Sequence, residues 1–465
     1  MKKNIILLIV SFALFMEAVD TTVLNTAIPV IAKSLNVNPI NLKIALISYL
    51  VSLAIFIPVS GWIADRFGAK RVFILAAMLF TASSVWCGFT DNLPELIIAR
   101  ITQGVGGSLT LPVGRLIIMR TCERHELVSK MSVVVMVAAI GMMLGPVLGG
   151  VISNHFSWRW IFWVNAPVGI LTVFLAIFLL PSMPSRPMPP LDKWGFILFG
   201  SGLAMLTIGL SVLSESDARH VLVVLSLPLA FCLLFLYAWH SYNRAHPIVK
   251  IELFRIRTFR VSILGNLFAR LGFGGFPFLL PLLLQIGLGY NSQTSGLLLA
   301  PTALGVLIVK PLSVHILRWF GYKKLLIVNT ILVGIALGMF AFINAQTSFI
   351  AIALLSFFYG LLISLQYTGM NSLAYANVDA EEMSAATSIV STTQQLAQSF
   401  GVAAAALLIR ISASLSHDPA LSIRSFHLTF IAMSLLTFAS IVIFIQLKKE
   451  DGHELIDIPV RTATV

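Results

Sequence analysis

The chain has 465 residues, of which 58% are apolar and only 11% are charged. A soluble domain carries roughly 25% charged and about 45–50% apolar residues, so this composition excludes a soluble globular protein. A bilayer that acts as solvent for the apolar surface accounts for it. The net charge of +12 does not indicate nucleic acid, because the cations fall in short loops between apolar runs, where membrane topology requires them.

Apolar windows of about 20 residues, the length that crosses the hydrocarbon core, recur about fourteen times along the chain. They predict an all-α polytopic membrane protein. The predicted spans are 5–30, 44–63, 72–90, 95–119, 128–153, 158–182, 194–214, 220–241, 260–286, 294–317, 324–343, 348–371, 385–410 and 426–447.

Lys and Arg are unevenly divided between the two sides of such a bundle. With the N-terminus in the cytoplasm, about 22 of the 31 fall on the cytoplasmic side and about six on the other. The positive-inside rule then predicts a multi-pass protein of the cell inner membrane with both termini cytoplasmic.

The first predicted span contains two acids, Glu17 and Asp20, three residues apart and therefore on one helix face. Ionisable residues are expensive inside a bilayer and indicate a functional site. Two close carboxylates cannot both ionise easily, and a carboxylate that takes up and releases a proton is what proton-coupled transport requires. The alternative is an Asp20 that stays paired with a cation and serves only packing.

A faint internal repeat follows the second span. The loop at 65–71 reads Asp-Arg-Phe-Gly-Ala-Lys-Arg, and the loop at 318–324 reads Arg-Trp-Phe-Gly-Tyr-Lys-Lys. Matching the two aligns spans 1–6 with spans 9–14 and leaves spans 7 and 8 as an insertion, which is a transporter plan. We expect a six-helix bundle over 1–182, an inserted helix pair and cytoplasmic linker over 183–259, a second six-helix bundle over 260–447, and a cytoplasmic tail over 448–465.

Three further cations lie inside predicted spans. Arg100, in the fourth span, is the natural partner of Asp20, either coupling protonation to conformation or serving as a static tie between helices. Lys310 lies within about two turns of the cytoplasmic end of its helix and can snorkel. Arg270 is too deep for that, so it either binds an anionic group of the substrate or pairs with an acid on another helix.

The thirteenth span is unusually polar, running from Ser391 to Ser399 through three glutamines. Gln394 and Gln398 share one face, and such a stripe cannot face lipid cheaply. It is predicted either to line a cavity or to tie helices together.

Five stretches resemble motifs of the major facilitator superfamily, in its fourteen-span drug:proton antiporter branch. They are the loop motif at 61–71, the motif at 100–107 that begins with Arg100, the glycine-rich motif at 141–150, and the pair of motifs at 20–29 and 158–169. Within this branch the chain is most similar to bacterial multidrug efflux proteins of the MdtD type. The resemblance covers essentially the whole chain.

The resemblance implies roles for particular residues. It implies a cytoplasmic gate formed by Gly61, Asp65, Arg66, Gly68, Lys70 and Arg71. It implies that Arg100 and Asp20 take part in proton transfer. It also implies the antiporter motif of exporters, formed here by Gly141, Gly145, Pro146, Gly149 and Gly150. Asn25 lies in the first-span motif and joins Arg270, Lys310, Gln394 and Gln398 as a substrate-binding candidate. Two residues depart from the pattern, since Arg318 stands in the second-half loop where Asp65 stands in the first, and Gln394 replaces an arginine. Glu17 is outside the family pattern.

The sequence therefore favours a proton-coupled exporter of drugs or other amphipathic small molecules by alternating access. The alternative is a dedicated exporter of an endogenous anionic metabolite such as a carboxylate siderophore, favoured by Arg270, Lys310 and the scarcity of buried acids. A membrane protein retained for sensing or scaffolding is disfavoured by the intact motif at 141–150. We expect no enzymatic activity and no bound cofactor, metal or nucleic acid. The expected partners are the substrate, protons and lipid, and a periplasmic adaptor is a further candidate partner. We expect the protein to function as a monomer.

Overall fold

The computed structural model describes residues 2–213, 220–244, 246–379, 381–419 and 421–456. The expected inserted pair is thus described without residues 214–219, and the expected tail over 448–465 is described only to residue 456. Within these ranges the chain is helical and contains no strand.

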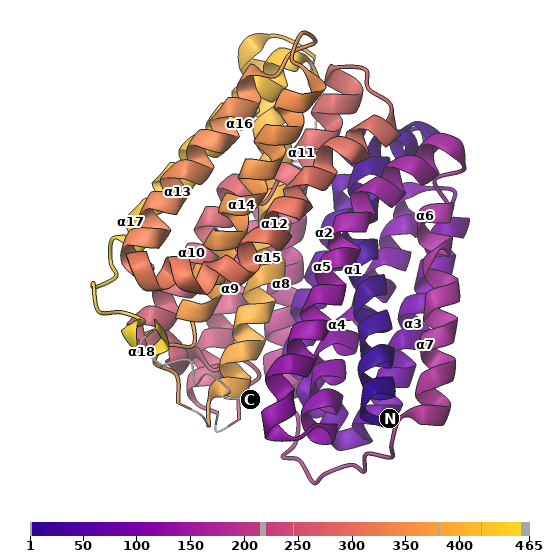
Figure 1. The fold of residues 1–465 in the computed structure, drawn as a ribbon, viewed down its shortest axis with the longest axis vertical. Coiled ribbons are helices and arrows are strands. Elements are labelled where there is room, and N and C mark those ends of the chain that lie inside the picture. The colour runs from indigo at the N-terminus through magenta and orange to yellow at the C-terminus, as the bar shows by residue number, and fades with distance from the viewer. Residues whose placement is uncertain (1, 214–219, 245, 380, 420, 457–465) are drawn as a thin grey trace, which may run out of the picture.

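Two groups of long helices stand side by side and run between the same two ends of the molecule (Figure 1). We call α1–α7 the first half and α10–α17 the second half. The first half consists of α1 (Lys2–Ser34), α2 (Lys43–Phe67), α3 (Ala69–Phe89), α4 (Leu93–Thr121), α5 (Arg124–His155), α6 (Trp160–Trp163) and α7 (Asn165–Leu179).

The second half follows an inserted pair and a short linker helix. The pair is α8 (Lys193–Leu213) and α9 (His220–Tyr242), and the linker holds the 3₁₀ turn η1 (Ile251–Arg255). The second half consists of α10 (Arg257–Phe273), α11 (Phe276–Leu282), the π turn η2 (Leu283–Gly287), α12 (Ser292–Phe320), α13 (Tyr322–Met339), the 3₁₀ turn η3 (Phe340–Phe342), α14 (Phe349–Leu373), α15 (Met383–Ser416), α16 (Ile423–Ala439) and α17 (Ile441–Phe444); α18 (His453–Ile456) lies in the tail.

Fourteen helical segments of the described chain are long and apolar enough to cross a membrane. The predicted fourteen-span all-α architecture is therefore confirmed. Three spans differ from the continuous helices that were expected, and one of them is the span predicted at 426–447, which breaks at Ser440 between α16 and α17. The span predicted at 260–286 breaks at Gly274 and Gly275, ahead of Pro277, and ends in a π turn, while the span predicted at 158–182 breaks at Val164, ahead of Pro167. Proline has no backbone N–H to donate, and its ring disfavours a helical conformation of the residue before it.

The turns between α2 and α3 and between α12 and α13 are built alike. Each is a single glycine with positive φ, Gly68 at 90° and Gly321 at 69°. Only glycine adopts this conformation at no steric cost, so the repeat seen in the sequence corresponds to the same sharp turn in both halves. A Cβ on Gly68 would also lie 2.7 Å from the carbonyl oxygen of Met183.

The opposite ends of the helices are marked by polar N-caps instead. The side chains of Asn92, Asn291, Ser348 and Ser422 accept hydrogen bonds from the first turns of α4, α12, α14 and α16. Such caps satisfy backbone N–H groups that a helix start leaves without partners. Cation-bearing glycine turns at one end and Asn or Ser caps at the other distinguish the two ends of the bundle.

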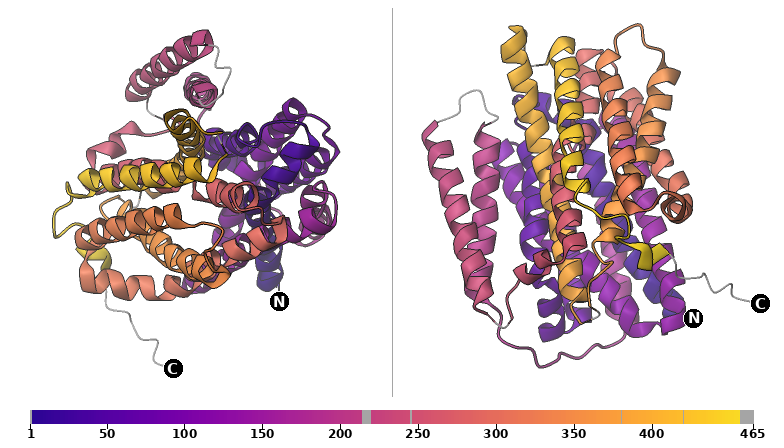
Figure 2. Two further views of the ribbon diagram at one scale, coloured as in Figure 1. Left: turned by 90° about the horizontal axis from the view of Figure 1, so that it is seen from above. Right: turned by 90° about the vertical axis from the view of Figure 1, so that its left-hand side faces the viewer.

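The inserted pair lies outside both halves, along one side of the molecule (Figure 2). α8 and α9 pack mainly on each other, and α8 also touches α2 and α15. The linker before α8 crosses the α2–α3 turn, where the backbone N–H of Arg186 donates to the carbonyl of Asp65 at 2.7 Å and the indole of Trp62 donates to the carbonyl of Pro189 at 2.8 Å.

The two halves meet closely at the capped end, which we call the sealed end. Here α5 packs against α12 and α2 against α15. Gln285 donates to the carbonyl of Thr26 at 2.8 Å, and the hydroxyl of Ser292 donates to the carbonyl of Gly150 at 3.2 Å. These hydrogen bonds join the halves through backbone carbonyls.

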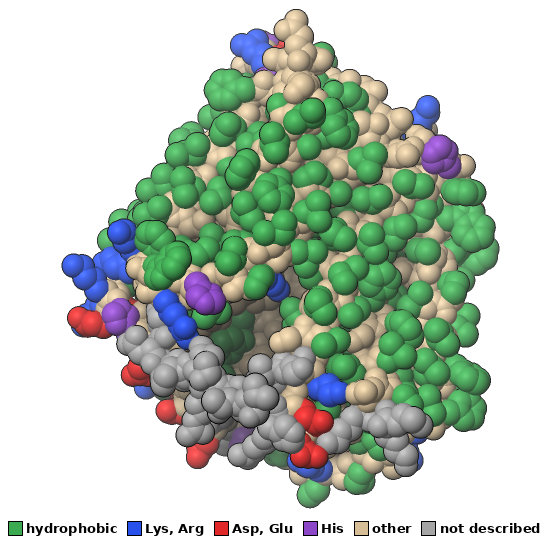
Figure 3. All heavy atoms as spheres, viewed as in Figure 1, with side chains coloured by type: hydrophobic (Ala, Val, Ile, Leu, Met, Phe, Trp, Pro, Cys, Tyr) green, Lys and Arg blue, Asp and Glu red, His purple; other side chains and the backbone are tan. Residues whose placement is uncertain are grey.

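Glycines make this close approach possible. A Cβ on Gly150 would overlap the carbonyl oxygen of Ser292, and one on Gly296 would overlap that of Pro146. Small residues at such positions let helix backbones touch. Toward the other end, which carries the Gly68 and Gly321 turns and which we call the open end, the space-filling view shows a hollow between the halves lined by hydrophobic side chains (Figure 3).

We expect Gly150→Ala to disfavour this sealed arrangement, because the new methyl group must displace the Ser292 carbonyl. Spin labels on Asn154→Cys and Thr294→Cys, one on each half, should report a longer and broader distance distribution in the variant. The background replaces Cys87, Cys122 and Cys232 by alanine. Gly338→Ala is the matched control, since its Cβ would lie 3.4 Å from Ser434, an ordinary contact; equal distributions in both variants would contradict the close-approach argument.

Candidate functional site

Asp20 lies at the meeting point of several helices of the first half and is completely buried. Its Oδ2 is 2.6 Å from Nη1 of Arg100 on α4. Its Oδ1 accepts hydrogen bonds from the amide of Gln103 at 2.9 Å and from the amide of Asn165 on α7 at 3.0 Å. A single carboxylate thus joins α1, α4 and α7 through an ion pair and two amide hydrogen bonds.

Arg100 is equally buried and is held on several sides. Besides Asp20 it contacts Oε1 of Gln103 at 2.7 Å and the carbonyl of Ala45 at 3.4 Å. Its guanidinium lies 4.2 Å from the centre of the Tyr49 ring, a cation–π distance. The structure therefore brings Asp20 and Arg100 together in a site without solvent access, where an ion pair is sensitive to the loss of either charge.

Glu17 occupies a different environment one turn earlier on α1. It is half-buried, and its Oε2 has no hydrogen-bond partner in the described part of the protein. The charges that act on it are those of Arg115 on α4 and of Asp20. It therefore does not share the hydrogen-bonded cluster of Asp20, although both lie on one helix.

The gate residues expected at 61–71 fall into two groups. Asp65 forms an ion pair with Arg120 at the end of α4. Lys70 donates to the carbonyls of Ile177 and Leu180 at 2.8 and 2.7 Å and so caps α7. These contacts lie within the first half.

Among the other gate candidates, Gly68 is buried, whereas Gly61, Arg66 and Arg71 are exposed. A Cβ on Gly61 would meet nothing within 4 Å. Packing therefore explains Gly68 but not Gly61 among the glycines of this motif.

The glycines of the 141–150 motif form the contact surface between α5 and α1. A Cβ on Gly141 would lie 2.9 Å from the carbonyl of Phe15, while one on Gly145 or Gly149 would overlap Thr22 or Val23. The hydroxyl of Thr26 also donates to the carbonyl of Pro146 at 3.2 Å. α1, which carries Asp20, is therefore packed directly on the helix that meets the second half.

A second polar cluster surrounds Arg270 on α10, which is only 8% exposed. Its Nη1 donates to Oε1 of Gln398 at 3.2 Å, its Nε lies 3.4 Å from Oδ1 of Asn266, and its guanidinium lies 4.0 Å from the centre of the Tyr367 ring. Gln398 in turn donates to the carbonyl of Gly274 at 2.7 Å. Of the two expectations for Arg270, pairing with an acid on another helix is not observed among the described residues, whose ion pairs do not include it.

The other candidates are not gathered into one place. Gln394 is half-buried, one turn before Gln398 on α15, and Asn25 is 8% exposed on α1. Lys310 is exposed on α12. It lies on roughly the same helix face as Gly296, which is about four turns closer to the sealed end.

Several residues of the Asp20 cluster were missed by the sequence analysis. They are Gln103 and Asn165, which bind the carboxylate, and Ser84, which receives a hydrogen bond from Asn165 at 3.1 Å. The only feature in the sequence that could have identified them is a neutral polar residue within an apolar run. That signal is weak because many such residues bond only to their own helix.

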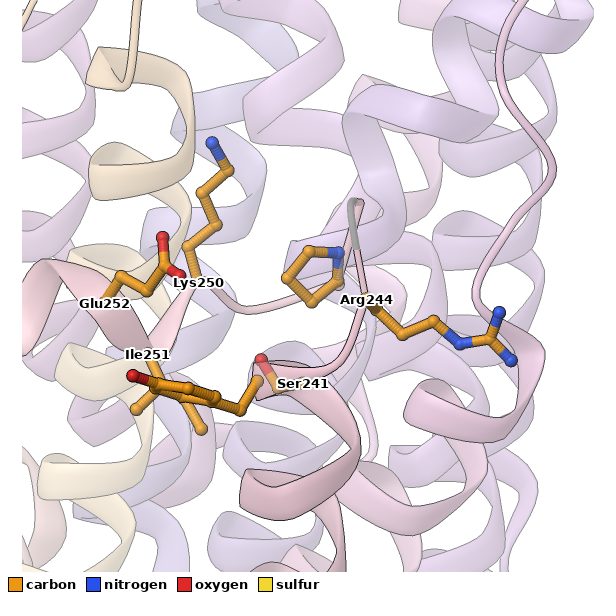
Figure 4. Close-up of a pocket in the computed structure, with 7 residues that line it drawn as sticks. Ser241, Arg244, Lys250, Ile251 and Glu252 are labelled. Atoms are coloured by element: carbon orange, nitrogen blue, oxygen red, sulfur yellow. The ribbon is translucent and has the colours of Figure 1, made fainter.

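A small pocket of about 180 Å³ lies outside both clusters, in the linker after α9. Figure 4 shows Ser241, Arg244, Lys250, Ile251 and Glu252 around it. Lys250 also lies 3.5 Å from Glu382 at the start of α15, which gives the acidic 379–382 loop a cation that its own sequence lacks. No group of three or more His, Cys, Asp or Glu side chains suited to a metal occurs in the described ranges.

Comparison with known proteins agrees with the fold and its motifs. The family model "Major Facilitator Superfamily" matches residues 10–402 and 263–459. The chain is 33% identical to "Putative multidrug resistance protein MdtD" of Enterobacter sp. (strain 638), over 96% of this chain and 95% of that protein. It is 34% identical to "Probable transport protein HsrA" of Haemophilus influenzae, over 97% of each.

Among solved structures, a D-xylose–proton symporter superposes with a TM-score of 0.70 at 17% identity, covering 97% of this chain and 99% of that one. An auto-inhibited peptide transporter of the POT family superposes with a TM-score of 0.67 at 15% identity, covering 96% and 98%. At such identities these structures support the fold alone. The family match and the long relatives identify a multi-pass membrane transporter and not an enzyme: the chain belongs to the major facilitator superfamily.

Proposed function

We propose that this chain is a proton-coupled antiporter that exports drugs or other amphipathic small molecules across the inner membrane. The proposal rests on the burial and pairing of Asp20. It is a fully buried carboxylate in the first span, 2.6 Å from a buried arginine. Intramembrane acids are costly and mark proton pathways in transporters.

Protonation of Asp20 would remove the negative member of the pair and leave Arg100 with neutral partners only. A buried charge that loses its partner is destabilised by about 3–5 kcal/mol, enough to shift a balance between two conformations. Asp20 and Thr26 are six residues apart on α1, roughly 9 Å along the axis, and Thr26 receives the bond from Gln285 that crosses between the halves. Movement of α1 therefore links the proton site to the sealed end.

The direction of transport follows from orientation and from relatives. The positive-inside rule supports cytoplasmic termini, which would make the open end cytoplasmic and the hollow accessible to substrate inside the cell. Similarity to proteins named as multidrug resistance proteins supports amphipathic compounds as substrates. The packed glycines of the 141–150 motif, which resemble the exporters' pattern, support efflux.

A second candidate function, the export of an endogenous anion, is favoured by Arg270. Its partners in the described structure are neutral: two amides and an aromatic ring. A carboxylate group of a substrate would give this buried cation the counter-charge that its surroundings lack.

Asp20→Asn is expected to lower proton-driven transport to below roughly a tenth of the parent rate, because an amide cannot carry the proton. The measurement is uptake of a cationic dye by inverted vesicles under an imposed pH gradient, normalised to folded protein. Asp91→Asn is the matched control, since Asp91 is 82% exposed and pairs only at the surface. The double variant Asp20→Asn with Arg100→Gln removes both charges and checks that loss of transport is not loss of folding. Full pH-driven uptake by Asp20→Asn would refute the proton assignment.

Arg270→Ala separates the two candidate functions in the same vesicles. If the substrate is an anion, a tricarboxylate probe should be transported by the parent protein and lose most of its uptake in the variant. If the substrates are cationic or neutral amphipathic compounds, dye uptake should persist in Arg270→Ala, and the anion should not be transported by either protein. Arg424→Gln, at a side chain that is 71% exposed, controls for the loss of a positive charge.

Asp65→Asn is expected to slow turnover several-fold while leaving the apparent substrate affinity nearly unchanged, because it breaks the ion pair with Arg120 far from the buried clusters. Initial rates over a range of substrate concentrations provide the test. An unchanged maximal rate would show that this motif does not gate transport in this protein.

A further inference from the structure

A second, larger pocket lies at the open end, on the outer surface of the second half. It occupies about 630 Å³ beside the turn between α12 and α13. Its lining residues come from this turn, from the first turns of α13, and from the tail: Arg318, Trp319, Phe320, Gly321, Lys323, Lys324, Ile327, Val328, Lys449 and His453. It contains none of the residues proposed for proton or substrate binding.

The lining of this pocket is strongly cationic. Arg318, Lys323, Lys324 and Lys449 contribute four positive charges, and no carboxylate is among the lining residues. Lys and Arg side chains gather at this edge of the molecule in the space-filling view, beside α13 and α18 (Figures 1 and 3). The three lysine charges around this cavity repel each other, so an anionic ligand would stabilise the arrangement.

The nearest acids of the tail do not neutralise the pocket from within. Asp451 accepts hydrogen bonds from Arg257, with Nε at 3.2 Å, and from the backbone N–H of Lys448 at 2.8 Å. Glu450 and Glu454 are exposed and do not line the cavity.

The equivalent turn of the first half has a different charge balance. There Asp65 precedes the turn glycine and pairs with Arg120, whereas Arg318 holds the matching position in the second half. The same backbone turn therefore carries an internal counter-charge in one half and an additional cation in the other.

The pocket opens onto apolar surface of the membrane-spanning region. Trp319 is 79% exposed at the end of α12, and tryptophan prefers the boundary between lipid and water. From Val328 an exposed apolar stripe continues along α13 at three- and four-residue spacing: Ile331, Leu332, Ile335 and Met339, each 38–52% exposed. A ligand that fits both features has an anionic head and long hydrocarbon chains.

We propose that this pocket binds the headgroup of an anionic phospholipid, with the acyl chains lying along the α13 stripe. Lys323, Lys324 and Lys449 contact the phosphate, and Trp319 anchors the rim at the interface. Basic pockets at the membrane surface bind lipid phosphates through such charges. Because Lys449 and His453 belong to the tail, the bound lipid also fixes the tail against the α12–α13 turn.

The test uses the purified full-length protein and requires no transport. Native mass spectrometry and thermal unfolding in detergent are measured with added phosphatidylglycerol, cardiolipin, phosphatidylcholine or soluble glycerol phosphate. The variant Lys323→Gln/Lys324→Gln/Lys449→Gln removes three pocket charges. The matched control Arg186→Gln/Lys193→Gln/Arg244→Gln removes three exposed cations, two from the linkers around α8 and α9 and one from the first residue of α8.

We expect anionic lipids to raise the unfolding temperature of the parent and of the control by several degrees, and the pocket variant to bind them roughly tenfold or more weakly. Equal binding of phosphatidylglycerol by the pocket variant would overturn the site. Equal stabilisation by phosphatidylcholine would show that the chains alone are recognised, and full competition by glycerol phosphate would show a soluble anion site; either result overturns the lipid assignment.

Discussion

The buried ion pair between Asp20 and Arg100 is the interaction on which the arrangement of the first half depends. It unites α1 and α4 directly, brings in α7 through Asn165, and holds Tyr49 of α2 against the guanidinium. In a region without water, neither charge can be left alone at small cost. The helices that supply these groups are therefore constrained together whenever both charges are present.

That constraint reaches the second half through glycine contacts. α1 packs on α5 at Gly141, Gly145 and Gly149, and α5 touches α12 at Gly150. Because these contacts bring the glycine backbone directly against backbone atoms and the short side chain of Thr22, a shift of α1 has little room to be absorbed locally. The packing connects Asp20, the residue proposed to bind the proton, to the interface between the halves.

The span count, the fold class and the pairing of Asp20 with Arg100 were predictable from the sequence because intramembrane charges are few and apolar runs are long. The hydrogen bonds of Gln103 and Asn165 were not, since nothing in the sequence distinguishes a glutamine that binds a carboxylate from one that bonds to its own helix. The interruption at Gly274 and Gly275 was also missed, because hydropathy averages over a window and does not sense a local break. The sequence likewise does not specify which end is sealed, since the proposed alternating access requires that either end can be sealed.

The linkers on either side of the inserted helix pair are bonded to different halves of the protein, and these bonds restrict how the halves can separate. Before α8, the linker is bonded to the α2–α3 turn of the first half through Asp65 and Trp62. After α9, Lys250 lies against Glu382 of the second half. The inserted pair is thus attached to both halves on one side of the molecule, and these attachments oppose separation of the halves at the open end on that side.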